Sequence, residues 1–111
     1  MAFSHRIIGG VNIVSIENSM DLYSVPELKK FCKILTRSEN SKILFNLKKV
    51  HFIDSSGLGF LTNLFFECQQ KGISIKFADL SDEVKRLFAL TKLDLSFKLY
   101  DSEGSAIQDF N

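Results

Sequence analysis

Hydrophobic and polar positions along this 111-residue chain follow two alternating periods. Short runs rich in β-branched and aromatic residues are typical of strands, whereas longer stretches with an apolar residue every three or four positions are typical of amphipathic helices. The predicted strands lie at 6–8, 11–16, 43–47, 73–77 and 97–100. The predicted helices cover about 25–37 and 55–70, and two more begin near 82 and 103.

Residues that favour turns and helix ends separate these elements. Gly9-Gly10 lies between two strand-like runs and predicts a β-hairpin. Ser24-Val25-Pro26-Glu27 has the Ser-x-x-Glu pattern of a capping box, with proline in the first helical turn. Gly72 is placed to end the second helix and Ser81 to begin the third.

This order of elements predicts a single α/β domain over residues 1–111. Repeated βα units imply a mostly parallel sheet of about four to five strands, and the first hairpin adds an antiparallel strand, so the sheet is mixed. Residues 73–77 alternate apolar with polar, so we expect the helices mainly on one face of the sheet. With 45% hydrophobic residues, the chain can build one substantial core.

One strand-to-helix connection contains side chains that could bind a ligand or be modified. It reads Phe52-Ile53-Asp54-Ser55-Ser56-Gly57-Leu58-Gly59-Phe60. Asp54 or Ser55 is predicted to cap the helix. Because a helix N-terminus presents unpaired N–H groups and partial positive charge, a serine there can carry a phosphate. The plainer interpretation is an ordinary capped helix start. Gly57 and Gly59 are unfavourable in a helix, which suggests that another backbone or a ligand approaches closely.

Residues 52–59 resemble the signature of the anti-sigma factor antagonists, the small bacterial STAS-domain proteins. Residues 20–28 resemble that family's Leu-Asp segment before the first helix, and residues 81–88 resemble its penultimate helix. The family usually has glycine just before the Leu-Asp pair, where this chain reads Glu17-Asn18-Ser19; Asn18 can adopt a left-handed conformation, so the turn is feasible. The resemblance implies a single STAS-like domain with a (βα) superhelix.

The resemblance also implies a function and a site. Ser55, directly after Asp54, matches the phosphorylated serine, so we expect Ser55 and not Ser56 to take phosphate. Asp21, Asp54, Ser56 and Gly57 would contribute to the surface that binds partners. The implied partners are a serine kinase that doubles as an anti-sigma factor, and a serine phosphatase. The unmodified protein would bind the kinase and release a sigma factor, and phosphorylation would switch it off, so regulating transcription.

Two substitutions express this hypothesis. Ser55→Asp should weaken kinase binding more than folding, because the added charge is favourable at the helix end and costly in an interface. Gly57→Ala should slow phosphorylation of Ser55 even where the melting temperature holds or rises, because we expect the partner to approach the bare Cα of Gly57.

Two other functions fit parts of the sequence. A hydrolase with Ser55 or Ser56 as nucleophile needs a base, and His51 is the only candidate nearby; the Gly-x-Ser-x-Gly pattern is missing. We therefore expect no enzymatic activity and no catalytic residue, and His51 could instead form a local hydrogen bond with Asp54. A STAS scaffold that is never phosphorylated, within a larger regulatory or transport complex, remains open.

Composition disfavours further classes of function. The net charge is +1, and the short pair Lys48-Lys49 is expected in a solvated loop, so nothing indicates a nucleic-acid partner. Cys32 and Cys68 lack metal-binding spacing and are expected as free core residues, with no metal and no cofactor. No run approaches the roughly 18 apolar residues of a membrane helix, and the N-terminus lacks a signal core, so we expect a cytoplasmic protein without a membrane partner.

Overall fold

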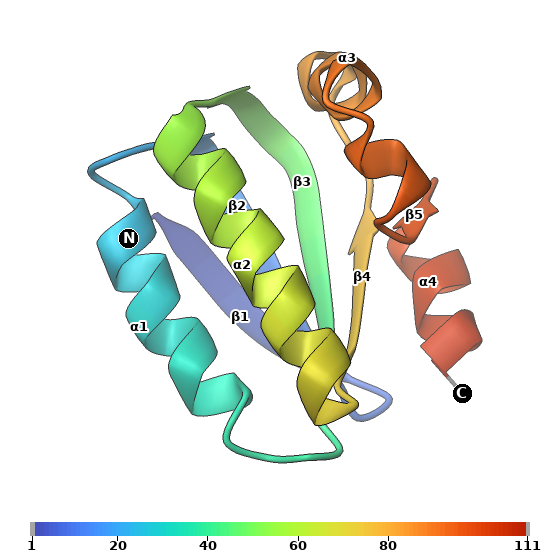
Figure 1. Cartoon of the computed structure of the whole chain (residues 1–111). Coiled ribbons are helices and arrows are strands. Elements are labelled where there is room, and N and C mark those ends of the chain that lie inside the picture. The colour runs from blue at the N-terminus through green and yellow to red at the C-terminus, as the bar shows by residue number, and fades with distance from the viewer. Residues whose placement is uncertain (1, 111) are drawn as a thin grey trace.

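The computed structural model describes residues 2–110, which form one five-stranded sheet and four α-helices (Figure 1). The strands are β1 (Phe3–Ile8), β2 (Val11–Met20), β3 (Lys42–Ile53), β4 (Ser74–Ala78) and β5 (Leu99–Tyr100). The helices are α1 (Val25–Leu35), α2 (Ser55–Lys71), α3 (Asp82–Leu90) and α4 (Glu103–Phe110), with a short 3-10 helix, η1 (Leu93–Leu95), before β5. No helix in this described part is long and apolar enough to cross a membrane.

The strands lie side by side in chain order, from β1 to β5. β1 pairs antiparallel with β2, and every other neighbouring pair is parallel. Gly9 and Gly10 form the predicted hairpin turn, with φ values of 59° and 78° that glycine adopts without steric cost. The mixed, mostly parallel sheet expected from the sequence is confirmed.

Helices α1, α2 and α3 pack on one face of the sheet, and α4 covers part of the other (Figure 1). Neighbouring β3 residues divide between the two layers: Phe45 lies in the larger core and Leu44 in the smaller one beneath α4. The prediction of helices mainly on one face is confirmed. Lys76 is nevertheless only 9% exposed, because α4 lies over it, and its Nζ is 3.1 Å from the Tyr100 hydroxyl.

β3 is longer than predicted and runs directly into the signature stretch. Since it continues to Ile53, Lys48 and Lys49 are exposed strand residues, so their expected placement in a loop is wrong. Asn18 on the neighbouring strand has φ of 67°, the left-handed conformation expected there. β3 ends at Ile53 and α2 begins at Ser55, so the turn between them consists of Asp54 alone.

Helix ends follow the sequence signals with one exception. Gly72 ends α2 with φ of 70°, and the Ser81 hydroxyl caps α3 as predicted. Ser24 does not form the predicted capping box: its Oγ accepts a hydrogen bond from the Asp21 N–H and donates one to the Ser19 carbonyl, both at 3.0 Å. Because the Ser24 hydroxyl bonds to these groups of the preceding loop, it does not bond to the helix N–H groups as a capping box requires.

The last strand is shorter than the predicted 97–100. Phe97 is buried, and its ring stacks on Phe77 at 4.6 Å and meets Phe88 edge-on at 5.5 Å between centroids. This aromatic contact holds residue 97 in the core beneath α3, so pairing with β4 is confined to Leu99 and Tyr100.

Candidate functional site

The β3–α2 turn is built around the carboxylate of Asp54. Its Oδ1 accepts a hydrogen bond from the Gly57 N–H at 3.0 Å, and its backbone is extended, which is the geometry of a helix N-cap. Its Oδ2 accepts one from the Leu22 N–H at 3.2 Å, and its own N–H donates to the Met20 carbonyl at 3.1 Å. Asp54 therefore caps the start of α2 and also ties that helix to the β2–α1 loop.

Asp21 gives the β2–α1 loop its shape. Its Oδ1 accepts hydrogen bonds from the N–H groups of Tyr23 at 2.9 Å and Ser24 at 3.0 Å, and its Oδ2 accepts one from the Ser19 hydroxyl at 2.8 Å. These bonds, led by that of Ser19, hold the pKa of Asp21 below its ordinary value. Because its carboxylate is engaged within the loop, Asp21 shapes the surface beside the turn and does not present a free acid.

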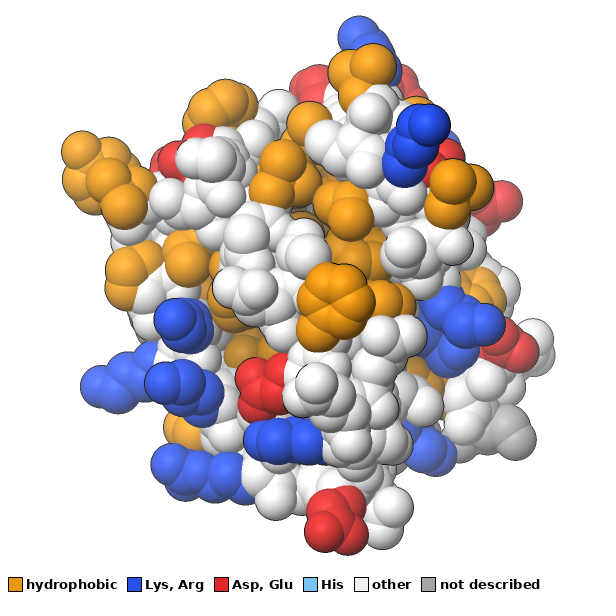
Figure 2. All heavy atoms as spheres, in the orientation of Figure 1, with side chains coloured by type: hydrophobic (Ala, Val, Ile, Leu, Met, Phe, Trp, Pro, Cys, Tyr) orange, Lys and Arg blue, Asp and Glu red, His pale blue; other side chains and the backbone are white. Residues whose placement is uncertain are grey.

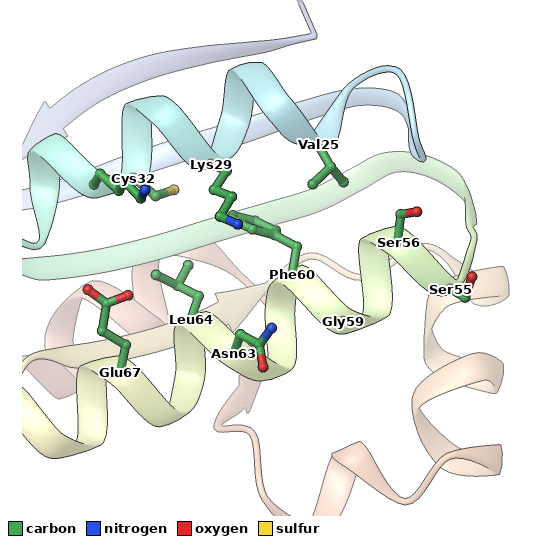
Figure 3. A pocket seen from close by; sticks show the side chains of 11 residues that line it. Val25, Lys29, Cys32, Ser55, Ser56, Gly59, Phe60, Asn63, Leu64 and Glu67 are labelled. Atoms are coloured by element: carbon green, nitrogen blue, oxygen red, sulfur yellow. The ribbon is translucent and has the colours of Figure 1, made fainter.

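The two serines of the turn differ in exposure. Ser55 is the first residue of α2 and is exposed, whereas Ser56 is half-buried; both lie at the N-terminal end of the helix (Figure 3). The first N–H groups of a helix have no intrahelical acceptor, and Asp54 takes only that of Gly57. The helix end therefore stabilises an anion attached to Ser55.

Gly57 packs against the protein's own backbone. It is buried, and a Cβ at this position would lie 2.4 Å from the Met20 carbonyl oxygen and 2.7 Å from the Ile53 Cγ2. The glycine thus lets α2 lie against the end of β2. The close approach expected at Gly57 comes from the protein's own β2, which occupies the space that we assigned to a partner, so alanine there is now expected to lower the melting temperature.

Three large apolar side chains surround the turn and are exposed to solvent. They are Leu22 (64% exposed) and Tyr23 (89%) in the β2–α1 loop, and Phe52 (59%) at the end of β3. Sequence reasoning missed them, although an aromatic residue in a loop beside the signature stretch was a usable signal. Exposed aromatic residues of this size are enriched where proteins bind each other.

A groove of about 290 Å³ runs between α1 and α2 and begins at the same turn (Figure 3). Its lining includes apolar side chains of both helices and two lysines of α1: Val25, Cys32, Phe60, Leu64, Lys29 and Lys33. Figure 2 shows basic side chains gathered over α1 and hydrophobic side chains between the two helices. The groove was not predicted, because it exists only where two helices distant in sequence pack together.

Among residues 2–110, His51 and the two cysteines belong to no cluster of His, Cys, Asp and Glu that could hold a metal ion. The His51 Nδ1 is 3.0 Å from the Glu83 carboxylate on α3, so the suggested hydrogen bond with Asp54 is replaced by a longer-range pair. The pKa of Glu83 lies below its ordinary value because its own backbone N–H and His51 donate to it. Cys32 and Cys68 are free and buried, and burial raises the pKa of their thiols to about 12 and about 11.

Comparison with known proteins identifies the class. The model of the STAS domain matches residues 2–106, so this chain belongs to the STAS domain family. Within that class it is similar to anti-sigma factor antagonists. The anti-sigma-B factor antagonist of Bacillus subtilis is 36% identical over 96 residues, which cover 82% of this chain and 84% of that protein.

Solved structures agree with this assignment. A candidate anti-sigma factor antagonist from Thermotoga maritima superposes with a TM-score of 0.88 at 27% identity, covering 97% of this chain and 93% of the other. The Bacillus cell fate determinant SpoIIAA in its phosphorylated form has a TM-score of 0.76 at 17% identity, over 99% of this chain and 100% of the other, and it shares the fold.

Proposed function

We propose that this protein is an anti-sigma factor antagonist that works as a phosphorylation switch in the cytoplasm. In its unmodified form it binds an anti-sigma factor that is also a serine kinase, and a sigma factor is thereby released. Phosphate on Ser55 ends this binding, and a serine phosphatase restores it. The protein acts by binding and not by catalysis.

The observation that carries the proposal is the placement of Ser55. It is an exposed hydroxyl at the positive end of a helix whose start is fixed by Asp54, so it can accept a phosphate without rearranging the fold. The Bacillus subtilis relative is an antagonist of an anti-sigma-B factor, and the SpoIIAA structure is of a phosphorylated protein. The first supports the role of an antagonist, and the placement of the phosphate on Ser55 rests on the resemblance of residues 52–59 to the family signature.

The surface around Ser55 supplies the binding site in this proposal. Leu22, Tyr23 and Phe52 are the apolar contacts, and Asp21 and Asp54 hold the loop and turn that present them. Ser56 and Gly57 flank Ser55 on α2. Ser56 lies in the groove wall, and Gly57 lets α2 pack closely against β2.

Phosphorylation changes the charge of that surface. A phosphoserine adds about −1.5 to −2 charges at neutral pH. Burying this charge against a partner's apolar residues costs desolvation without a compensating ion pair. Binding is therefore lost while the fold is kept.

The test is phosphate mapping by tandem mass spectrometry after incubation with a purified anti-sigma factor kinase and ATP. We expect one phosphate, on Ser55, in the wild type and in Ser56→Ala, and none in Ser55→Ala. Phosphate that persists at full yield in Ser55→Ala contradicts the assignment. A wild-type protein that binds the kinase without being phosphorylated supports the alternative of a STAS scaffold that is never modified.

A further inference from the structure

We propose that the groove between α1 and α2 is a second part of the partner interface, and that it binds an amphipathic, acidic helix of the anti-sigma factor. This inference rests on the proposed function and names the chemistry of the partner that the protein takes. Three observations carry it: a glycine that no internal contact requires, a groove with an apolar floor, and an excess of positive charge along one rim.

Gly59 has no internal explanation. Glycine inside a helix is unfavourable relative to alanine, yet a Cβ at Gly59 would meet no atom within 4 Å. Gly57, two residues earlier, differs because the Met20 carbonyl requires it. Gly59 is exposed and forms part of the groove wall, so its bare Cα lets an external backbone approach α2 closely.

The groove between the two helices has an apolar floor: Cys32, Phe60 and Leu64 belong to the main core, and Val25 is partly exposed beside them. Phe60 and Leu64 of α2 face Val25 and Cys32 of α1 across it, and Figure 3 shows these side chains directed between the helices. An amphipathic helix binds such a groove by inserting apolar residues spaced three or four positions apart. The occupant is therefore expected to present one apolar stripe.

The charge along the rim of the groove indicates which side chains the bound helix carries beside its apolar stripe. Lys29 and Lys33 lie on the α1 side, and neither forms a salt bridge among residues 2–110. On the α2 side, Glu67 is already paired with Lys71 at 2.9 Å. Lys71, by its hydrogen bond, and Lys33, by its charge, hold the pKa of Glu67 below its ordinary value. The rim keeps an excess of positive charge, because Lys29 and Lys33 face this single carboxylate, and acidic side chains beside the apolar stripe complement it.

The groove is also coupled to the switch by its position. Ser55 and Ser56 line the end nearest the turn. A phosphate on Ser55 places negative charge beside an acidic occupant, so a single modification repels the partner at the turn and in the groove.

The test measures the affinity of the protein for a purified anti-sigma factor kinase from the organism that encodes this chain, by titration calorimetry. Lys29→Glu/Lys33→Glu should weaken binding at least about tenfold. Gly59→Gln places a side chain in the groove, and it should weaken binding at least about tenfold while the melting temperature holds or rises.

Two matched controls separate the groove from general effects. Lys30→Glu/Arg37→Glu makes the same change in net charge at exposed positions of the same region that do not line the groove. Gly104→Gln makes the same glycine replacement in α4. Both controls should bind within about threefold of the wild type.

The outcomes distinguish this inference from the proposed function, with Ser55→Asp as the reference variant. If Ser55→Asp loses binding while the groove variants match their controls, the groove inference is overturned and the switch stands. If the groove variants lose binding and Ser55→Asp does not, the groove stands and the switch at Ser55 is wrong. A wild type that binds no anti-sigma factor kinase overturns both.

Discussion

At the scale of single residues, two glycines in one helix serve different surfaces. Gly57 is buried against the Met20 carbonyl, and Gly59 is open to solvent. The sequence identified both as unfavourable in a helix, and predicted that something approaches each. It could not tell which one meets the protein's own backbone, because that depends on where β2 ends relative to α2.

Alanine substitutions at these glycines should therefore act in opposite directions. Gly57→Ala should lower the free energy of unfolding by about 1–3 kcal/mol, because its methyl group collides with the Met20 carbonyl and α2 must shift. Gly59→Ala should raise it by up to about 1 kcal/mol, since alanine favours the helix and has free space. Urea unfolding of the two variants and the wild type measures both values. A Gly57→Ala protein as stable as the wild type contradicts this account.

Other residues of the site show the same division between local and non-local information. Asp54 was one of the two N-cap candidates, with Ser55, because capping is decided within four residues. Its bond to Leu22 was not predicted, because the two residues are 32 positions apart. The Ser24 capping box failed for a related reason: a loop that folds back on Asp21 offered the hydroxyl different partners.

At the scale of elements, α4 is held to the sheet by polar contacts at both ends. Near its start, the Glu103 Oε2 accepts hydrogen bonds from Arg6 at 2.5 Å and Asn46 at 2.6 Å. Near its end, Asp109 contacts Tyr100 and Lys76. The start of this helix near residue 103 was predicted, but the Glu103–Arg6 pair joins positions 97 residues apart and had no sequence signal.

The pH dependence of stability should report the start of α4. Burial raises the pKa of Glu103, but the hydrogen bonds from Arg6 and Asn46 outweigh it, and the pKa lies below its ordinary value of 4.5. A lowered pKa contributes stability that is complete above the unfolded value, and that is lost as the pH falls from about 4.5 through the pKa of the folded protein.

Glu103→Gln should therefore be less stable than the wild type near neutral pH, and the difference should shrink below about pH 4.5. Urea midpoints at about pH 7 and pH 3 test this. Glu27→Gln is a matched control, because Glu27 is exposed on α1 and forms no salt bridge among residues 2–110. A pH-independent difference for Glu103→Gln would show that its carboxylate is not what holds α4.

At the scale of the whole molecule, the core and the candidate switch occupy different regions. The main core lies between the sheet and helices α1, α2 and α3, whereas Ser55 stands at the exposed start of α2. The sequence predicted the order of elements, the mixed sheet and the turn, because periodicity and caps are local. It did not predict the groove, or the exposed apolar side chains of Leu22, Tyr23 and Phe52 beside the turn, because both surfaces are assembled from segments that meet only in the fold.

This separation predicts that phosphorylation leaves the fold intact. Protein phosphorylated on Ser55 should unfold within about 1 kcal/mol of the unmodified protein, or at slightly higher stability, because a negative charge at the N-terminus of α2 is worth about 0.3–1 kcal/mol there. Ser56→Asp is the contrasting variant, because Ser56 is half-buried in the groove wall and a carboxylate placed there is partly desolvated. The Ser56→Asp protein should be less stable than the protein phosphorylated on Ser55.

Urea unfolding with matched slopes, together with hydrogen exchange of α2 and β3, measures whether the structure changes. Unchanged exchange with lost kinase binding means that phosphate acts at the surface, by its charge, in the way that the turn geometry requires. If phosphorylation instead lowers stability by several kcal/mol or frees the amides of α2, the modified turn melts the start of the helix. Loss of binding would then come from unfolding of the interface, and the N-cap hydrogen bond of Asp54 would oppose that unfolding.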